Sequence, residues 1–263
     1  MLNLMVDKET LALHKTAVIV QIGLVVFDGN FNPVTELDLK IDVTASLLDG
    51  FEADPGTARG FWAKQPTAVI RSVLYDGPRL TPRDAARVLD KWLKDVFKGQ
   101  DFAVWANGIL FDIPKFDHLF ERYGMKPLTA RTRYNLVYDF RTLRAAAKQL
   151  YPLKYAHAEE LLKNDALHNA LADCHWQVAM LGAVMAILGG KYEIVDDSIP
   201  PETEPPELVG ELAEPPAQRA PDGQRKVLIE EAAPEPSWDD QPEDDAFLAH
   251  VYGETPSTNA DAG

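Results

Sequence analysis

Three strand-like segments at the start of the chain limit its fold more than any other feature. Residues 2–6 form a short apolar run, residues 17–27 form a long apolar run typical of a buried strand, and residues 34–43 loosely alternate apolar and polar side chains. Asp28-Gly29-Asn30, between the last two runs, is a tight-turn sequence. Because short turns join neighbouring strands antiparallel, we expect the sheet to begin with a three-stranded meander.

Helical spacing of apolar residues follows the meander and alternates with short strands. Thr81, Pro82 and Asp84 mark a helix start, because Thr caps the helix, Pro fits its first position and the acid favours its first turn. This order of elements predicts one α/β domain with a mixed sheet. The expected helices cover residues 66–74, 82–99, 113–123, 141–150 and 170–188, and the expected strands cover residues 102–105 and a short run that ends at Tyr138.

The composition of the chain changes at about residue 194. Residues 194–263 hold 11 of the 19 prolines and 18 acidic against 3 basic residues, so this segment alone accounts for the net charge of −15. Large apolar residues are few there outside two short islands, 227–229 and 247–252. Such a segment buries too little apolar surface to offset the entropy of ordering. We therefore expect a folded domain at residues 1–193 and a disordered, Pro-rich acidic tail at residues 194–263.

Cysteine content and hydropathy indicate the compartment. The single cysteine, Cys174, excludes an internal disulfide framework and fits a reducing cytoplasm. No apolar run is expected to approach the length of a membrane span, and the first residues lack the features of a signal peptide. We therefore expect a cytoplasmic protein with no membrane partner.

Two carboxylates stand where the first apolar run ends. Asp7 and Glu9 are separated by Lys8, so both acidic side chains point to the same side of an extended backbone. Adjacent carboxylates repel each other at neutral pH unless one takes up a proton or a cation lies between them. Paired hard oxygen ligands suit Mg²⁺ or Mn²⁺. The alternative is a strand that ends in two solvated charges.

Further acidic residues stand at the ends of elements later in the chain. Asp112 lies between a buried strand and a helix, where it either caps that helix or has a functional role. His168 and Asp173 open the long helix. The alternatives for these two are a surface cap residue and an acid that the helix dipole stabilises.

The order and context of these residues resemble the DnaQ-like DEDD exonucleases, in the branch with a catalytic histidine. That family carries D-x-E in its first strand, an aspartate after a later strand and H-x-x-x-x-D near its last helix. The resemblance covers roughly residues 1–190 and is nearest to phage DexA-type exonucleases. It implies an RNase H-like fold with a mixed five-stranded sheet flanked by helices. It also implies that the protein works in a bacterial cytoplasm, or in the cytoplasm of the host if a phage encodes the chain. The matching segments are Val6-Asp7-Lys8-Glu9-Thr10-Leu11, Gln21-Ile22-Gly23, Phe61-Trp62-Ala63-Lys64-Gln65, Trp105-Ala106-Asn107-Gly108 with Phe111-Asp112, Asp139-Phe140-Arg141-Thr142-Leu143, and His168-Asn169-Ala170-Leu171-Ala172-Asp173.

The resemblance implies the catalytic roles. His168 would be the general base that takes a proton from the attacking water. Lys8 departs from the family's usual apolar residue and is expected to point away from the metals. Two divalent metal ions, Mg²⁺ or Mn²⁺, would be held by Asp7, Glu9, Asp112 and Asp173.

The resemblance also implies substrate contacts. Thr10, Leu11 and Asn107 would bind the terminal nucleotide. Trp62, with the neighbouring Phe61, would either offer a stacking face for a base or pack in the core. The remaining matched polar pair, Asp139 and Arg141, would form an internal pair or cap, or act directly.

The function expected from the sequence is a metal-dependent 3′–5′ exonuclease. It would release nucleoside monophosphates from the 3′ end of single-stranded nucleic acid, with DNA favoured. An exoribonuclease of the same fold is the alternative within the enzyme class, because no residue indicates a contact to the 2′-OH. An interaction scaffold, in which the acidic tail binds a basic protein partner, is the alternative from another class.

Overall fold

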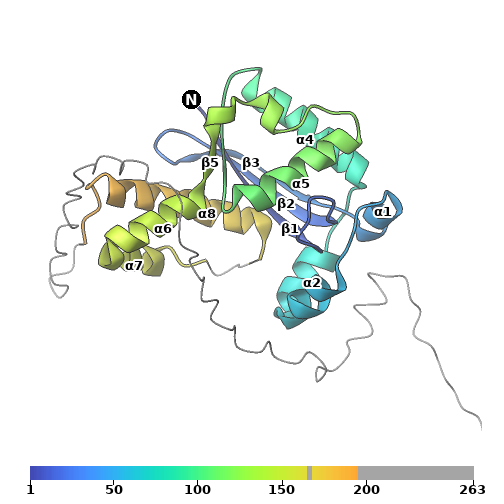
Figure 1. Cartoon of the computed structure of the whole chain (residues 1–263), viewed down its shortest axis with the longest axis horizontal. Helices are drawn as coiled ribbons and strands as arrows, with labels where there is room; N and C mark the ends of the chain where they lie inside the picture. Colours follow the sequence, from blue (N-terminus) through green and yellow to red (C-terminus); the bar gives the residue numbers. More distant parts are fainter. Residues whose placement is uncertain (165–167, 195–263) are drawn as a thin grey trace, which may run out of the picture.

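The described residues of the computed structural model, 1–164 and 168–194, form a five-stranded mixed sheet in the order β3-β2-β1-β4-β5. β1 pairs antiparallel with β2, and β2 with β3, which confirms the expected meander. β4 and β5 add parallel strands on the other side of β1. The strands are β1 Asn3–Thr10, β2 Ile19–Phe27, β3 Pro33–Lys40, β4 Ala103–Ala106 and β5 Val137–Asp139 (Figure 1).

The helices lie on both faces of this sheet (Figure 1). Their bounds are α1 Val43–Leu48, α2 Pro55–Gly60, α3 Thr67–Ile70, α4 Pro82–Phe97, α5 Ile109–Arg122, α6 Phe140–Leu150, α7 Pro152–Leu161 and α8 Ala170–Leu188. A π-helical turn, Arg71–Tyr75, continues α3, and short 3₁₀ turns cover Trp62–Lys64, Thr129–Arg131 and Tyr134–Leu136. The mixed sheet with flanking helices confirms the fold class expected from the sequence.

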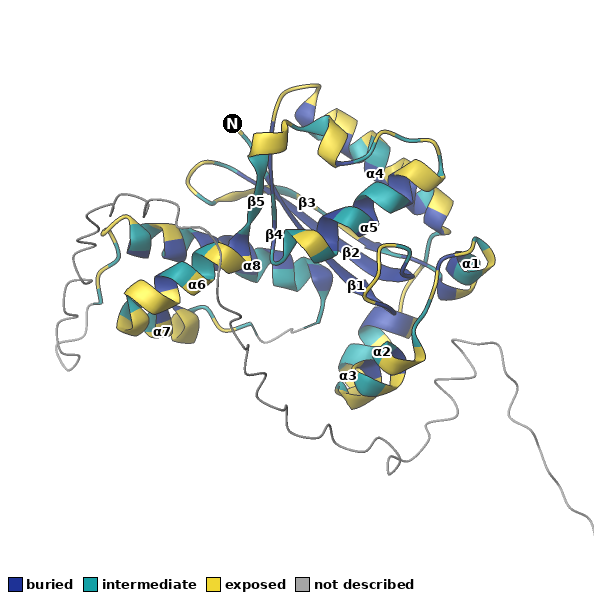
Figure 2. Cartoon of the chain, viewed as in Figure 1, coloured by how far each residue is buried: buried dark blue, intermediate teal, exposed yellow. Residues whose placement is uncertain are grey.

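The two faces of the sheet carry separate apolar layers, and β1 contributes to both. Leu4 and Val6 pack with residues of α4 and α5, whereas Met5 packs with residues of α6, α7 and α8. The neighbouring strands β1 and β2 are correspondingly dark blue, and so buried, along most of their length in Figure 2, whereas β3 and β5 are more exposed. Because side chains alternate along a strand, Lys8 continues the α5 side, and Asp7 and Glu9 continue the α8 side.

α8 lies directly on β1, β2 and β3. A Cβ atom at Gly23 would lie 2.2 Å from the carbonyl carbon of Ala170, so only glycine permits this approach. The Ala170 N–H donates to Oε1 of Gln21 at 3.2 Å, which ties the first turn of α8 to β2. Gln21-Ile22-Gly23 therefore places the start of α8 beside the end of β1.

α8 also corrects one expectation from the sequence. Its 19 residues are long and apolar enough to cross a membrane, so the expectation that no apolar run approaches that length was wrong. Here the helix packs against the sheet and against α6 and α7. The expected tail and its two apolar islands fall on residues 195–263, outside the described residues.

Candidate active site

The ends of the parallel strands β1 and β4 open into one cavity of about 750 Å³. β4 stops at Ala106, and Gly108 then turns with a φ of 119°, a backbone that favours glycine. α5 begins directly after this turn, four residues earlier than expected. Gly108 is thus the N-cap and Asp112 lies in the first turn, so the alternative in which Asp112 caps this helix is wrong.

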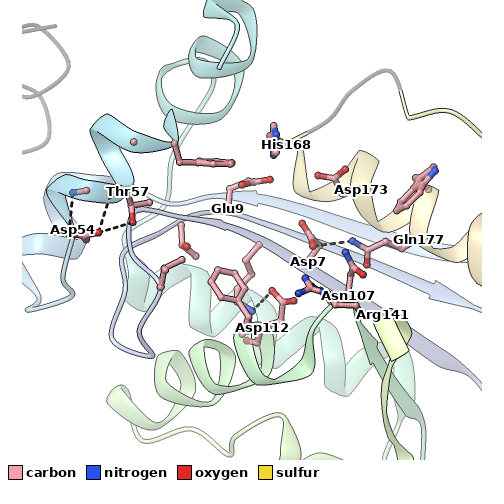
Figure 3. A pocket seen from close by; sticks show the side chains of 18 of the residues that line it. Asp7, Glu9, Asp54, Thr57, Asn107, Asp112, Arg141, His168, Asp173 and Gln177 are labelled. Carbon is pink, nitrogen blue, oxygen red and sulfur yellow. Dashed lines mark hydrogen bonds and ion pairs between the residues drawn. The ribbon is translucent and has the colours of Figure 1, made fainter. Parts of the chain in front are cut away.

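Three of the four expected metal ligands form a cluster in this cavity. Asp7 and Glu9 come from β1, and Asp173 comes from the first turn of α8, which Asn169 caps. One oxygen from each of the three carboxylates lies within 4.8 Å of the other two. Figure 3 shows Glu9 and Asp7 side by side with Asp173 facing them.

The electrostatics of the cluster favour a bound cation. Burial, followed by repulsion from the neighbouring acids, raises the pKa of Asp7 well above its usual value. The same two causes raise the pKa of Glu9 to about 8, and burial raises that of Asp173 to about 6. A divalent cation among these oxygens would offset the repulsion. The donor set, carboxylates alone, fits Mg²⁺ or Mn²⁺.

Asp112 lines the same cavity but is held by Lys8. The Lys8 ammonium lies 3.2 Å from Oδ1 of Asp112, also donates to its backbone carbonyl, and lies 4.2 Å from the centre of the Phe116 ring. Burial lowers the pKa of Lys8, and the Asp112 carboxylate opposes that shift. Lys8 thus leaves β1 on the face opposite Asp7 and Glu9, but its ammonium reaches a candidate ligand at the cavity, so the expectation that it points away from the metals stays a prediction.

His168 lies on the side of the cluster away from Asp112 (Figure 3). Its backbone adopts a left-handed conformation with a φ of 62°, which is uncommon for a residue other than glycine. Its backbone N–H donates to the Asp173 carboxylate, and its ring meets Phe61 edge-on with centroids 4.9 Å apart. Burial lowers the pKa of His168, which favours the neutral form of its imidazole.

The expected substrate residues divide into two groups. Thr10 and Asn107 line the cavity, as does Phe61. Leu11 and Trp62 are fully buried, and the Trp62 indole N–H donates to the Thr10 carbonyl at 2.9 Å. Trp62 thus packs in the core, the other alternative left open by the sequence, where its indole is hydrogen-bonded to the backbone of Thr10.

Sequence reasoning missed several residues of the cavity. Gln177 donates from Nε2 to Asp7 at 3.1 Å, and its position one turn after Asp173 was the signal that would have found it.

Asp139 caps α6, as one alternative had it. Arg141, matched but left open, lines the cavity and donates to the Asn107 carbonyl at 2.9 Å. Arg144 and Trp176 also line the cavity.

Exonuclease I shares this fold at low sequence identity. One exonuclease I structure matches with a TM-score of 0.53 at 16% identity, over 73% of this chain and 42% of that chain. E. coli exonuclease I in complex with a dT13 oligonucleotide matches with a TM-score of 0.50 at 17% identity, over 73% of this chain and 41% of that chain. A moderately thermophilic exonuclease I from Methylocaldum szegediense matches with a TM-score of 0.53 at 15% identity, over 73% of this chain and 42% of that chain. This chain spans less than half the length of these proteins.

The family of the chain follows from its sequence. No curated protein matches it. Residues 2–185 match the family described as the 3′–5′ exoribonuclease Rv2179c-like domain. With the shared fold, this match confirms the resemblance to DnaQ-like DEDD exonucleases, whereas the nearness to phage DexA-type enzymes stays a prediction. The chain belongs to the Rv2179c-like 3′–5′ exoribonuclease domain family.

Proposed function

We propose that the chain is a metal-dependent exonuclease that removes nucleoside 5′-monophosphates from the 3′ end of single-stranded nucleic acid. The observation that carries this proposal is the cluster of Asp7, Glu9 and Asp173, of which Glu9 is buried and the other two are half-buried, in an open cavity. The family description favours RNA as the substrate. DNA, which the sequence favoured, is the alternative substrate, because exonuclease I, which shares the fold, has been solved in complex with a dT13 oligonucleotide.

The residues divide the chemistry among them. Asp7, Glu9 and Asp173 would hold one divalent ion, and Asp112 would help to hold a second. Ions at these positions would lower the pKa of the attacking water and offset the charge that develops on the phosphate. Gln177 keeps Asp7 oriented through its hydrogen bond of 3.1 Å. Thr10 and Asn107 contact the terminal nucleotide from the cavity floor.

His168 takes the proton from the water. Its lowered pKa favours the neutral imidazole, which is the form that accepts a proton. The water oxygen forms a bond to phosphorus while the bond from phosphorus to the 3′-oxygen of the preceding nucleotide breaks. That 3′-oxygen then takes a proton from solvent, and a nucleoside 5′-monophosphate leaves.

The test uses the full chain with 5′-labelled RNA and DNA ten-mers, single- and double-stranded, with Mg²⁺, with Mn²⁺ or with EDTA. We expect the single strands to shorten from the 3′ end, one nucleotide at a time, only when metal is present. Asp7→Asn should abolish the reaction. Asp95→Asn, the same change on the exposed face of α4, should leave it intact.

Three results would contradict the proposal: no cleavage of any strand, cleavage in EDTA, or full activity of the Asp7→Asn protein. The first of these would leave the scaffold alternative, in which the acidic segment binds a partner. The relative rates on the RNA and DNA strands decide between the two sugars.

A further inference from the structure

The cavity has two walls of different chemistry. One wall comes from α6 and α8 and carries Arg141, Arg144 and Trp176, which we call the arginine wall. The other comes from α2 and the chain around it and carries Leu13, Asp54 and Phe61. Among the described residues that line the cavity, the cations are Lys8, Arg141 and Arg144. Because Lys8 is buried and paired with Asp112, the two cations left to meet a phosphate lie on the arginine wall.

Arg144 is held in place by its neighbours on the arginine wall. Its Nε donates to the Tyr155 hydroxyl at 3.1 Å, and its outer nitrogen lies 3.6 Å from Glu159. The guanidinium stacks over the Trp176 ring at 4.8 Å and over the Phe140 ring at 5.5 Å. Its side chain is 23% exposed, so it keeps a face toward the cavity. A fixed guanidinium loses little entropy when its remaining N–H groups meet phosphate oxygens.

Glu159 is the acid that faces Arg144, and it does not cancel the arginine's charge. The Glu159 side chain is 47% exposed, and an ion pair of this kind is weak because water screens it. Arg141 lies one turn before Arg144 on the same face of α6 and is anchored to the Asn107 carbonyl at 2.9 Å. The two guanidinium groups therefore form a short row along α6 at the edge of the cavity that holds the carboxylates.

Trp176 adds an aromatic surface to this row. It lies one turn after Asp173 on α8, so it is adjacent to the metal cluster. A half-buried indole that stacks with an arginine is the combination that binds sugars and bases without reading their sequence. The described part of the opposite wall contributes the Phe61 ring and the Asp54 carboxylate, which repels phosphate.

We propose that the arginine wall binds the phosphates that precede the cleaved one, so that the strand leaves the cavity over α6 while its 3′-terminal base lies against Phe61. This inference rests on the proposed function, because it assigns a path to the strand that the function requires. It predicts that Arg144 matters more for a long strand than for a dinucleotide without a 5′-phosphate, whose only phosphate is the one that is cleaved.

The test compares a ten-nucleotide single strand with a dinucleotide. We expect Arg144→Ala to lower the kcat/KM ratio of the long to the short substrate about tenfold, the loss of one charged hydrogen-bonding contact. Arg144→Lys, which keeps the charge, should recover part of the ratio. Arg59→Ala, an exposed cation on α2 outside the cavity lining, is the matched control and should keep the wild-type ratio.

Binding gives a second readout that is independent of turnover. In an Asp7→Asn background, Arg144→Ala should weaken binding of the ten-mer and reduce the slope of log affinity against log salt by about one phosphate contact. Circular dichroism confirms that the variant is folded. If wild-type protein neither binds nor cleaves a strand, the proposed function fails. If it does both and Arg144→Ala behaves like Arg59→Ala, the function stands and the assigned path is wrong.

Discussion

His168 should set the pH dependence of the reaction. The neutral imidazole accepts the proton, so at saturating metal, which keeps the carboxylates ionised, the rate rises with pH as His168 deprotonates, and burial lowers the pKa of that step. His168→Ala should reduce the single-turnover rate by about 10²–10⁴-fold, the range for a positioned base. Rates measured between about pH 5 and 8 test this. A variant with the wild-type pH profile would remove His168 from the mechanism.

Lys8 and Asp112 form a buried ion pair, in which each charge is stabilised by the other. Lys8→Met should cost about 3–5 kcal/mol of unfolding free energy, because it leaves the Asp112 carboxylate buried without a counter-charge. Mn²⁺ should restore more stability to this variant than it adds to the wild type. Thermal melts with and without Mn²⁺ measure the difference. The double variant Lys8→Met/Asp112→Asn should recover stability without metal, and failure to do so would mean that the pair is not the cause.

The candidate ligands could be predicted from the sequence because each stands at the end of a recognisable element. Asp7, Glu9 and Asp173 come together as expected. The contact between Lys8 and Asp112 could not be predicted, since it joins residues 104 positions apart on different elements. Local patterns fix the face on which a side chain starts, but not the partner that a long, flexible lysine reaches.

At the scale of elements, length decided which predictions succeeded. β2 and α8 were expected from their long, nearly uninterrupted apolar sequences, and α4 from its helical spacing and its start signal. α1 and α2 were missed because six residues are too few to show a helical period, although Asp42 and Asp54 cap them. α7 was missed because its polar and apolar residues do not separate onto two faces.

The contact between α8 and β2 has a single-residue test. Gly23→Ala places a methyl group 2.2 Å from the Ala170 carbonyl carbon, so α8 must shift and Asp173 with it. We expect a loss of about 3 kcal/mol in stability and a loss of activity in the protein that remains folded. Gly29→Ala is the control, because no atom lies within 4 Å of its new methyl group. Denaturant unfolding and the ten-mer assay would show the two variants to be alike if the contact is unimportant.

At the scale of the whole molecule, one domain holds every residue of the proposed mechanism. The family match ends at residue 185, close to the end of α8. The boundary expected at residues 193 and 194 stays a prediction, because it rests on the charge and proline content of the segment that follows. Composition locates such a boundary, whereas pairing within the domain depends on long-range contacts that composition does not encode.

A crystal structure grown with Mn²⁺ and a nucleoside 5′-monophosphate tests the central claim most directly, because manganese is located by its anomalous scattering. We expect a Mn²⁺ peak bound by Asp7, Glu9 and Asp173, with the phosphate against it and the base toward Phe61. Manganese bound elsewhere, with these three carboxylates left without an ion, would contradict the account.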